Sequence, residues 1–324
     1  MNWAKTLETY PEANFLQSPE WKKANEIVGT KTIVADFEKD GSALMLVRDA
    51  KRGRYLEIAC GPLIDWQDIK LRYEVFDDIR RIAKENHCVF VRIRPQLRRT
   101  PENIDILKSL KLRQSPMHLA AEHTVILDLT KSEDELLANM RRQTRYEVRR
   151  AEKLGIKVEK SCSEETFREF YKAQTETARR QHFIPPTLEL LLAEHKAFEE
   201  DAIIYIAKTS EGKPIAYGLV INNGTEAAYF EAASTSLNKN LPGAYAIIWQ
   251  AAKDLRTKGI TRFNLWGIAP PNQPNHRYAG VTTFKTGFGG EIVEYVPAHD
   301  LVIHKFKYLK NLFVETIRKK KRHL

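Results

Sequence analysis

Cysteine is scarce in this sequence. Cys60, Cys88 and Cys162 are its three cysteines, they lie far apart, and no CxxC pair occurs. Neither a disulfide framework nor a zinc site is therefore expected, and buried thiols are the simplest interpretation. Long apolar runs are missing too, since no segment supplies the roughly 20 apolar residues of a membrane-spanning helix and no signal-peptide pattern opens the chain. These absences predict a cytoplasmic protein.

Several catalytic and nucleotide-binding motifs are also absent. The sequence contains no GxSxG, HExxH or Walker A pattern, and no GxGxxG that opens a helix. Nucleophile-elbow hydrolases, zinc proteases, nucleoside triphosphatases and dinucleotide-binding enzymes therefore lack their residues here. We expect neither a bound metal nor a cofactor.

Positive charge is abundant. The formal net charge is +10 and the pI is about 9.3, which favours an anionic partner such as nucleic acid, a phosphorylated metabolite or an acidic membrane surface. Apolar residues make up 43% and charged residues 29% of the 324 positions, which is typical of a globular protein. This length suits two domains of ordinary size.

One order of elements recurs along the chain: strand, helix, left-handed stop, strand, proline. In the first copy the strand covers 55–60, the helix 68–84 with Asn86 as its stop, and the second strand 88–93. In the second copy these elements are strands at 217–221 and 227–232, a helix from Pro242-Gly243 to Gly259, and a strand at 262–266. The pattern predicts two related α/β domains. Chance similarity between two ordinary α/β units is the alternative.

Between the two copies we expect a strand over 124–129 and one long helix over 132–154. Ser132 and Glu135 form a capping box, and Gly155 closes the helix. Arginines recur on it every four residues, at Arg141, Arg145 and Arg149. This basic stripe suits the phosphates of an RNA, although interspersed glutamates make a solvated face equally consistent with the sequence.

A last helix is expected over 300–321. One of its faces is apolar and must dock, and the first domain is the expected site. The helix ends in the basic residues 319–322. These residues favour contact with anionic lipid or with RNA, unless they form a solvated terminus.

The stretch 263–290 contains the candidate catalytic residue, Lys285. It stands between Phe284 and Phe288 and is followed by three glycines. Glycines allow a backbone to approach a ligand closely, and aromatic rings keep water away. An ammonium in such a setting stabilises developing negative charge. An ordinary lysine at a strand edge is the alternative.

These segments together resemble the FemABX family of tRNA-dependent aminoacyltransferases, which build the interpeptide bridge of peptidoglycan. The matching pieces keep their order and are 17–21 (QSPEW), 140–155 (MRRQTRYEVRRAEKLG), 214–216, 228–230, Trp249, Gly267 and 284–290 (FKTGFGG). The resemblance implies an α/β fold of two tandem GNAT-like domains. We assign 1–122 to the first, completed by the C-terminal helix 300–324, and 123–299 to the second.

The resemblance also implies a reaction. An amino acid moves from aminoacyl-tRNA to an amine on the peptide stem of a UDP-linked or lipid-linked peptidoglycan precursor, and no ATP is needed because the ester is already activated. Contact with the inner face of an anionic membrane would be peripheral. The alternatives are a GNAT-like N-acyltransferase that uses another acyl donor and a non-wall acceptor, and a non-enzymatic protein that binds RNA or the envelope.

The predicted roles follow from this reaction. Lys285 stabilises the oxyanion or the tRNA terminus, and Arg141, Arg145 and Arg149 bind tRNA phosphates. The predicted substrate-binding residues are Tyr229, Arg179, Phe284, Phe288, Trp21 and Lys22, with core packing as the alternative for Tyr229 and a surface position for Arg179. No histidine or carboxylate stands out as a general base, and His276 is the nearest candidate.

Two features depart from the family pattern. Asn25 stands where relatives often have a lysine for the diphosphate of the precursor, and the segment 181–200 is too short for the helical-hairpin arm of some members.

Overall fold

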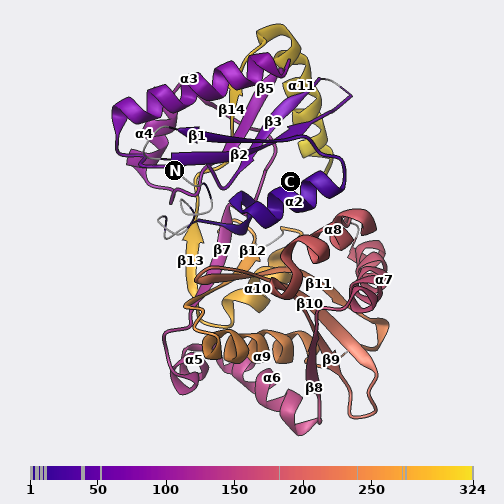
Figure 1. Cartoon of the computed structure of the whole chain (residues 1–324). Helices are drawn as coiled ribbons and strands as arrows, with labels where there is room; N and C mark the ends of the chain where they lie inside the picture. The colour runs from indigo at the N-terminus through magenta and orange to yellow at the C-terminus, as the bar shows by residue number, and fades with distance from the viewer. Residues whose placement is uncertain are drawn as a thin grey trace. The chain divides into compact units, whose positions relative to one another are not determined.

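The computed structural model describes residues 13–37, 41–51, 53–181, 183–238, 240–271 and 276–322, with the single positions 3, 7, 10 and 273. The chain forms two compact units (Figure 1). Unit 1 comprises Met1–His123 and Glu294–Leu324, and unit 2 comprises Thr124–Val293. Unit 2 is thus one continuous segment of the chain, whereas unit 1 combines an N-terminal and a C-terminal segment.

Unit 1 is built on a mixed sheet with strand order β1-β2-β3-β5-β14-β6, with β4 paired to β2. The strands are β1 (Thr32–Phe37), β2 (Gly41–Arg48), β3 (Tyr55–Ala59), β4 (Leu63–Ile64), β5 (Phe90–Arg94), β6 (Arg113–Gln114) and β14 (His299–Val302). The helices are α2 (Pro19–Ile27), α3 (Ile69–Glu85), α4 (Pro101–Ser109) and α11 (Lys305–Arg322), and a short 3-10 turn covers Phe15–Gln17. The predicted strands of this unit are present.

Helix α3 shows why this part of the sequence folds as it does. The Asp68 side chain accepts a hydrogen bond from the Leu71 amide and caps the helix, and the buried Val75 and Ile79 lie one turn apart on its inner face. The predicted left-handed stop at Asn86 is wrong by one residue. Asn86 has φ −91° and caps the helix, while His87 takes the positive φ of 56°.

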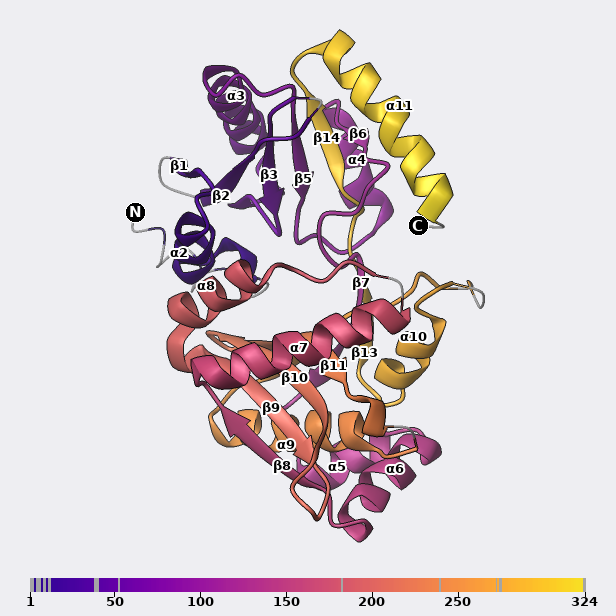
Figure 2. The same cartoon turned by 90° about the vertical axis from the view of Figure 1, so that its right-hand side faces the viewer.

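The end of the chain differs from the prediction. Residues 299–302 form strand β14, which pairs with β5 and β6, and the helix begins only at Lys305. The predicted helical start at Asp300 is therefore wrong. Figure 2 shows α11 running beside β14 in unit 1. The two elements are joined by the Tyr308 hydroxyl, which donates to Asp300 Oδ2 at 3.0 Å.

Unit 2 has a sheet with strand order β13-β7-β12-β11-β10-β9-β8. The strands are β7 (His123–Asp128), β8 (Lys157–Ser161), β9 (Ala202–Lys208), β10 (Pro214–Asn223), β11 (Glu226–Ser234), β12 (Arg262–Gly267) and β13 (Glu291–Glu294). The helices are α5 (Glu133–Asn139), α6 (Arg142–Lys153), α7 (Glu164–Gln181), α8 (Leu188–Phe198), α9 (Gly243–Thr257) and α10 (Ala279–Thr286), with 3-10 turns at Glu199–Asp201 and Ser236–Asn238.

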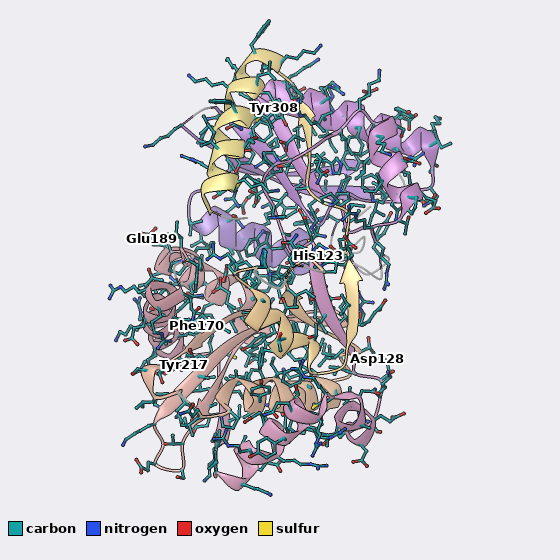
Figure 3. The ribbon with its side chains drawn as sticks, turned by 180° about the vertical axis from the view of Figure 1, so that it is seen from behind. His123, Asp128, Phe170, Glu189, Tyr217 and Tyr308 are labelled. Carbon is teal, nitrogen blue, oxygen red and sulfur yellow. The ribbon has the colours of Figure 1, made fainter. Side chains whose placement is uncertain are left out.

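Helices cover both faces of this sheet, with α6 and α9 on one face and α7 and α8 on the other (Figures 1 and 2). On the second face the ring of Phe170 in α7 packs against Tyr217 of β10, 6.3 Å between centroids (Figure 3). The apolar core on the first face includes Val148, Ile247 and Trp249.

The single helix predicted over 132–154 is wrong, because α5 and α6 are separate helices. The capping box of Ser132 and Glu135 is present, but Met140 and Arg141 have extended backbones with ψ 143°. The Arg141 amide donates to the carbonyl of Gly287 at 2.8 Å, so a contact with a distant segment replaces the helical hydrogen bond. Among the described residues, no helix is both long and apolar enough to cross a bilayer.

Candidate active site

A pocket of about 500 Å³ lies in unit 2 and contains several of the predicted residues. Strand β11, the C-terminal end of α7 and helix α10 contribute its walls. Tyr229, Glu231, Phe284 and Lys285 line it. The pocket therefore brings the predicted catalytic lysine together with two of the predicted substrate-binding residues and with a carboxylate.

Lys285 lies on α10, not at a strand edge. Its Nζ donates a hydrogen bond to the carbonyl of Gly267 at 3.0 Å. The side chain keeps some contact with solvent along the pocket wall, but the protein around the ammonium desolvates it and lowers its pKa to about 7. One hydrogen bond uses one of the three N–H donors of an ammonium, so donors remain for a ligand.

The carbonyl that holds Lys285 is set by an unusual backbone at the end of β12. Trp266 has φ 63°, a left-handed conformation that is costly for a bulky residue. Its amide donates to Asn264 Oδ1 at 2.9 Å, and its ring packs edge-on against Phe230 at 5.4 Å. The buried Asn264 also donates to Glu226 Oε1 at 3.2 Å. These contacts fix the turn that presents Gly267 to the ammonium.

The glycines after Lys285 pack against protein. A Cβ on Gly287 would lie 2.2 Å from Thr144 Oγ1, and one on Gly289, where φ is +81°, would lie 2.1 Å from the Asn139 carbonyl oxygen. The glycine backbone after Lys285 was expected to approach a ligand closely, and in the structure it approaches the junction between α5 and α6. It anchors the C-terminal end of α10 and, with it, the position of Lys285.

The three arginines of the predicted stripe have different environments. Arg141 Nη2 donates to the Thr283 carbonyl at 2.7 Å, near the C-terminal end of α10, where a cation is favourable. Arg145 Nη1 donates to the carbonyls of Leu137 and Ala138, both at 3.0 Å, at the end of α5. Arg149 is exposed on α6. Two of the three therefore hold helix ends, and their predicted contact with tRNA stays a prediction.

A half-buried carboxyl group, Glu231, lies at the other wall of the pocket and is influenced by a buried one, Glu194; neither was among the predicted residues. Glu231 Oε2 accepts a hydrogen bond from Gln174 Nε2 at 2.7 Å, and desolvation raises the Glu231 pKa to about 7. Glu194 of α8 is 1% exposed, and its Oε2 has no hydrogen-bond partner among the described residues. Desolvation and repulsion from Glu231 raise the Glu194 pKa well above its usual range. Both effects disfavour the carboxylate form of Glu194.

The aromatic residues of the motif divide between pocket and core. Phe284 lines the pocket, and its ring lies edge-on to Tyr245 at 4.8 Å and to Phe288 at 5.5 Å. Phe288 is 1% exposed and belongs to the apolar core. Tyr229 is 3% exposed, belongs to the apolar core and also lies at the pocket wall, and its predicted contact with substrate stays a prediction.

The remaining predicted residues lie elsewhere. Trp21 belongs to unit 1, where its ring packs edge-on against Phe15 at 5.7 Å. Lys22 pairs with Glu26 at 2.7 Å. Asn25 is buried, and its Nδ2 donates to the Trp21 carbonyl at 2.9 Å, which explains a side chain without charge at this position.

Arg179 is exposed in the last turn of α7 and does not line the pocket. His276 lies beside Tyr278, whose amide donates to its Nδ1 at 3.1 Å. The roles predicted for Arg179, Trp21 and Lys22 stay predictions. No cluster of three His, Cys, Asp or Glu side chains that could hold a metal ion occurs in the described parts of the chain.

Comparison with known proteins gives one family. The family model described as "FemAB family" matches residues 2–115, 112–213 and 200–315. The aminoacyltransferase FemA of Staphylococcus epidermidis is 23% identical over 341 residues, covering 78% of this chain and 82% of that protein. FemA of Staphylococcus aureus (strain MRSA252) is 21% identical over 321 residues, covering 73% and 76%.

Solved structures share the fold. The crystal structure of FemX has a TM-score of 0.83 at 17% identity and covers 95% of this chain and 96% of that chain. L-PGS from Bacillus licheniformis has a TM-score of 0.59 at 13% identity, covering 92% and 96%. A tandem GNAT protein from the clavulanic acid biosynthesis pathway has a TM-score of 0.51 at 11% identity, covering 81% and 77%. The predicted fold class, α/β with tandem GNAT-like architecture, is confirmed.

Proposed function

This chain belongs to the FemAB family, and from that premise we propose that it transfers an amino acid from aminoacyl-tRNA to an amine on the peptide stem of a peptidoglycan precursor. The acceptor is UDP-linked or lipid-linked, and the product extends an interpeptide bridge. The enzyme class predicted from the sequence, aminoacyltransferase, is confirmed by the family and by relatives of that name. The substrates and the residue roles below are our proposal.

One observation carries the proposed site: a desolvated ammonium, Lys285, faces a pocket of about 500 Å³ and is held by the Gly267 carbonyl. In the reaction the acceptor nitrogen attacks the ester carbonyl carbon, and the carbonyl oxygen becomes an oxyanion. A fixed cation at that oxygen needs little rearrangement as the charge develops. Preorganised stabilisation of this type is worth about 3 to 4 kcal/mol.

We assign the proton transfer between the acceptor amine and the leaving ribose oxygen to Glu231. The attacking amine must lose a proton as the C–N bond forms, and the tRNA ribose oxygen must gain one as the C–O bond breaks. A carboxylate at the pocket wall with a pKa of about 7 can accept the first proton and return it to the leaving oxygen. Glu194 acts through Glu231 as a positioning residue, because burial and repulsion from Glu231 disfavour its carboxylate form and leave Glu231 as the group that exchanges the proton.

Binding of the tRNA donor favours the protonated, positively charged form of Lys285. In the free protein the pKa of Lys285 is about 7, so the Lys285 side chain is neutral in a large share of the molecules at physiological pH. The phosphates of a bound tRNA end favour the charged form, because an opposite charge nearby raises the pKa of an ammonium. The donor therefore helps to create the cation that stabilises its own transition state.

The proposed tRNA contact is formed by Arg145 and Arg149 on α6 and by Arg141, which directly precedes this helix. Arg149 is the exposed member and offers its guanidinium to solvent, while the other two also hold helix ends. Peripheral contact with an anionic membrane surface completes the proposal. It is supported by the net charge of +10.

Incubation with a mixed pool of charged tRNAs and purified wall precursors, followed by mass measurement of the precursor, tests the function. A mass increment that requires charged tRNA and disappears in Lys285→Ala, with tRNA binding retained, is the expected result. Lys258→Ala, which removes an exposed lysine at the end of α9, is the matched control and should retain activity. An increment that requires acyl-CoA instead would favour the other acyl donor. tRNA binding without any increment would favour a non-enzymatic RNA-binding protein.

A further inference from the structure

Helix α11 has an apolar face that no described residue covers. Phe306 is 91% exposed, Phe313 67%, Leu309 52% and Ile317 39%. Their spacing of three, four and four residues places them in one stripe along the helix. At 1.5 Å per residue the stripe is roughly 17 Å long. The folded protein thus presents a continuous row of large apolar side chains to its surroundings.

The opposite face of the same helix is fixed to unit 1. Tyr308, which is labelled in Figure 3, is 2% exposed, and its ring packs edge-on against Phe90 with 5.5 Å between centroids. Glu315 pairs at 2.8 Å with Arg92, which also pairs with the buried Asp300 at 2.8 Å. The predicted docking on the first domain is made by this face. The exposed apolar stripe lies on the other side of the helix and points away from unit 1.

Positive charge borders the exposed stripe. Lys305 and Lys310 lie one on each side of it at 100° per residue, and both are exposed. Arg318 follows in the last turns, and 319–322 are all Lys or Arg in the sequence. Glu315 is the one acidic residue in the sequence of 305–322, and it is turned inward to Arg92. The outward surface of α11 is therefore apolar along its centre and cationic at its edges.

We infer that this face of α11 binds the surface of a bilayer rich in anionic phospholipid. A helix of this pattern lies in the plane of the interface, with its aromatic and aliphatic side chains in the acyl boundary and its lysines at the headgroups. Each Lys or Arg near such a surface adds attraction to anionic lipid. A second copy of the chain is a poorer occupant, because pairing two such faces would bring two rows of lysines together.

The inference deepens the peripheral membrane contact of the proposed function by naming its surface, but it does not depend on the transfer reaction. It can therefore be tested on binding alone. The full chain is sedimented with vesicles of phosphatidylcholine alone and with vesicles that also contain phosphatidylglycerol. We expect binding to the second kind only, and we expect added salt to weaken it.

The decisive variant is the pair Phe306→Ser and Phe313→Ser. We expect it to lower the partition coefficient on anionic vesicles at least tenfold, while the inward face of the helix stays intact. Ile69→Ser, which removes another exposed aliphatic side chain at 63% exposure, is the matched control and should bind like the parent. The charge variant Lys305→Glu with Lys310→Glu should lose the salt-dependent part of the binding.

Two results would overturn the inference. One is a Phe306/Phe313 variant that binds anionic vesicles as well as the parent. The other is a parent chain that self-associates without lipid through this face, seen as a larger sedimentation coefficient that the same variant abolishes. Transfer to a soluble UDP-linked acceptor, measured in parallel, separates this inference from the proposed function. The variant should retain that transfer, and a parent chain that binds vesicles but transfers nothing would contradict only the proposed function.

Discussion

Replacing Lys285 by methionine should make unit 2 more stable and the enzyme inactive. Methionine has nearly the length of lysine and no charge, so the change removes the ammonium while filling the same space. The folded protein lowers the pKa of Lys285 from 10.5 to about 7, which means that burial disfavours the charged form. Charged groups in a pocket that destabilise their own fold are typical of functional sites.

The size of the effect follows from the pKa. Each tenfold change in proton affinity corresponds to 1.36 kcal/mol, so a fall from 10.5 to about 7 sets an upper limit of about 5 kcal/mol. Solvent contact along the pocket wall screens part of this, and the lost hydrogen bond to Gly267 removes about 1 kcal/mol more. We expect Lys285→Met to gain about 1 to 2 kcal/mol at pH 6, or a rise in Tm of about 4 °C for a unit of this size.

The pH dependence has a defined sign. Between pH 7 and 10.5 the unfolded chain holds a proton on Lys285 that the folded chain has released, so the parent gains stability as pH rises through this window. Below pH 7 both states are protonated and the penalty is complete. The difference between Lys285→Met and the parent should therefore be largest at pH 6 and nearly vanish at pH 10. Urea unfolding at both values measures it. A variant that is less stable than the parent at pH 6, or a difference independent of pH, would refute the reasoning.

Three further predictions concern other residues. Glu231→Gln should lower kcat/KM about 10² to 10⁴-fold and remove the rise in activity as pH increases through about 7. Glu194→Gln, which imitates a neutral carboxyl, should leave the pH profile in place. Equal pH profiles for the two variants would contradict the role assigned to Glu231. Arg149→Ala should weaken tRNA binding and reduce the slope of log K against log salt by about 1, and an unchanged slope in a filter-binding titration would remove it from the contact. Asp300→Ala should lower the free energy of unfolding of unit 1 by about 3 kcal/mol, because it leaves the buried Arg92 without one of its two carboxylate partners. A loss below about 1 kcal/mol in chemical unfolding would show that Glu315 alone is enough to pair the Arg92 guanidinium.

Local signals in the sequence account for most of the fold. The strand predicted over 55–60 and the helix predicted over 68–84 agree with β3 and α3 to within one residue at each end, because alternation, a capping aspartate and apolar spacing act within a few residues. The break at Met140 and Arg141 could not be predicted this way. Neither residue is a helix breaker, and the extended backbone depends on a hydrogen bond to Gly287, which is far away in the sequence.

The candidate site was predictable only in part. Lys285 stood out through its aromatic and glycine neighbours, and the pocket contains it. Glu231 did not, because a single glutamate in an alanine-rich strand reads as a solvent-facing residue. Its raised pKa comes from desolvation by the surrounding protein, which outweighs the lowering effect of the hydrogen bond from Gln174 on helix α7. No spacing pattern in the sequence shows that these side chains lie close together in the fold. The one weak indication of a functional Glu231 was a charged residue within the otherwise apolar run 227–233.

The position of β14 has a consequence for how the protein is made on the ribosome. This strand lies between β5 and β6 and comes from the last part of the chain. The N-terminal segment leaves the ribosome first but lacks an inner strand until residue 302 has been synthesised, while residues 124–293 are by then complete. The usual order of domain maturation during translation is thus reversed. The gap beside β5 must be kept from pairing with other chains for the whole time that the intervening unit is being made.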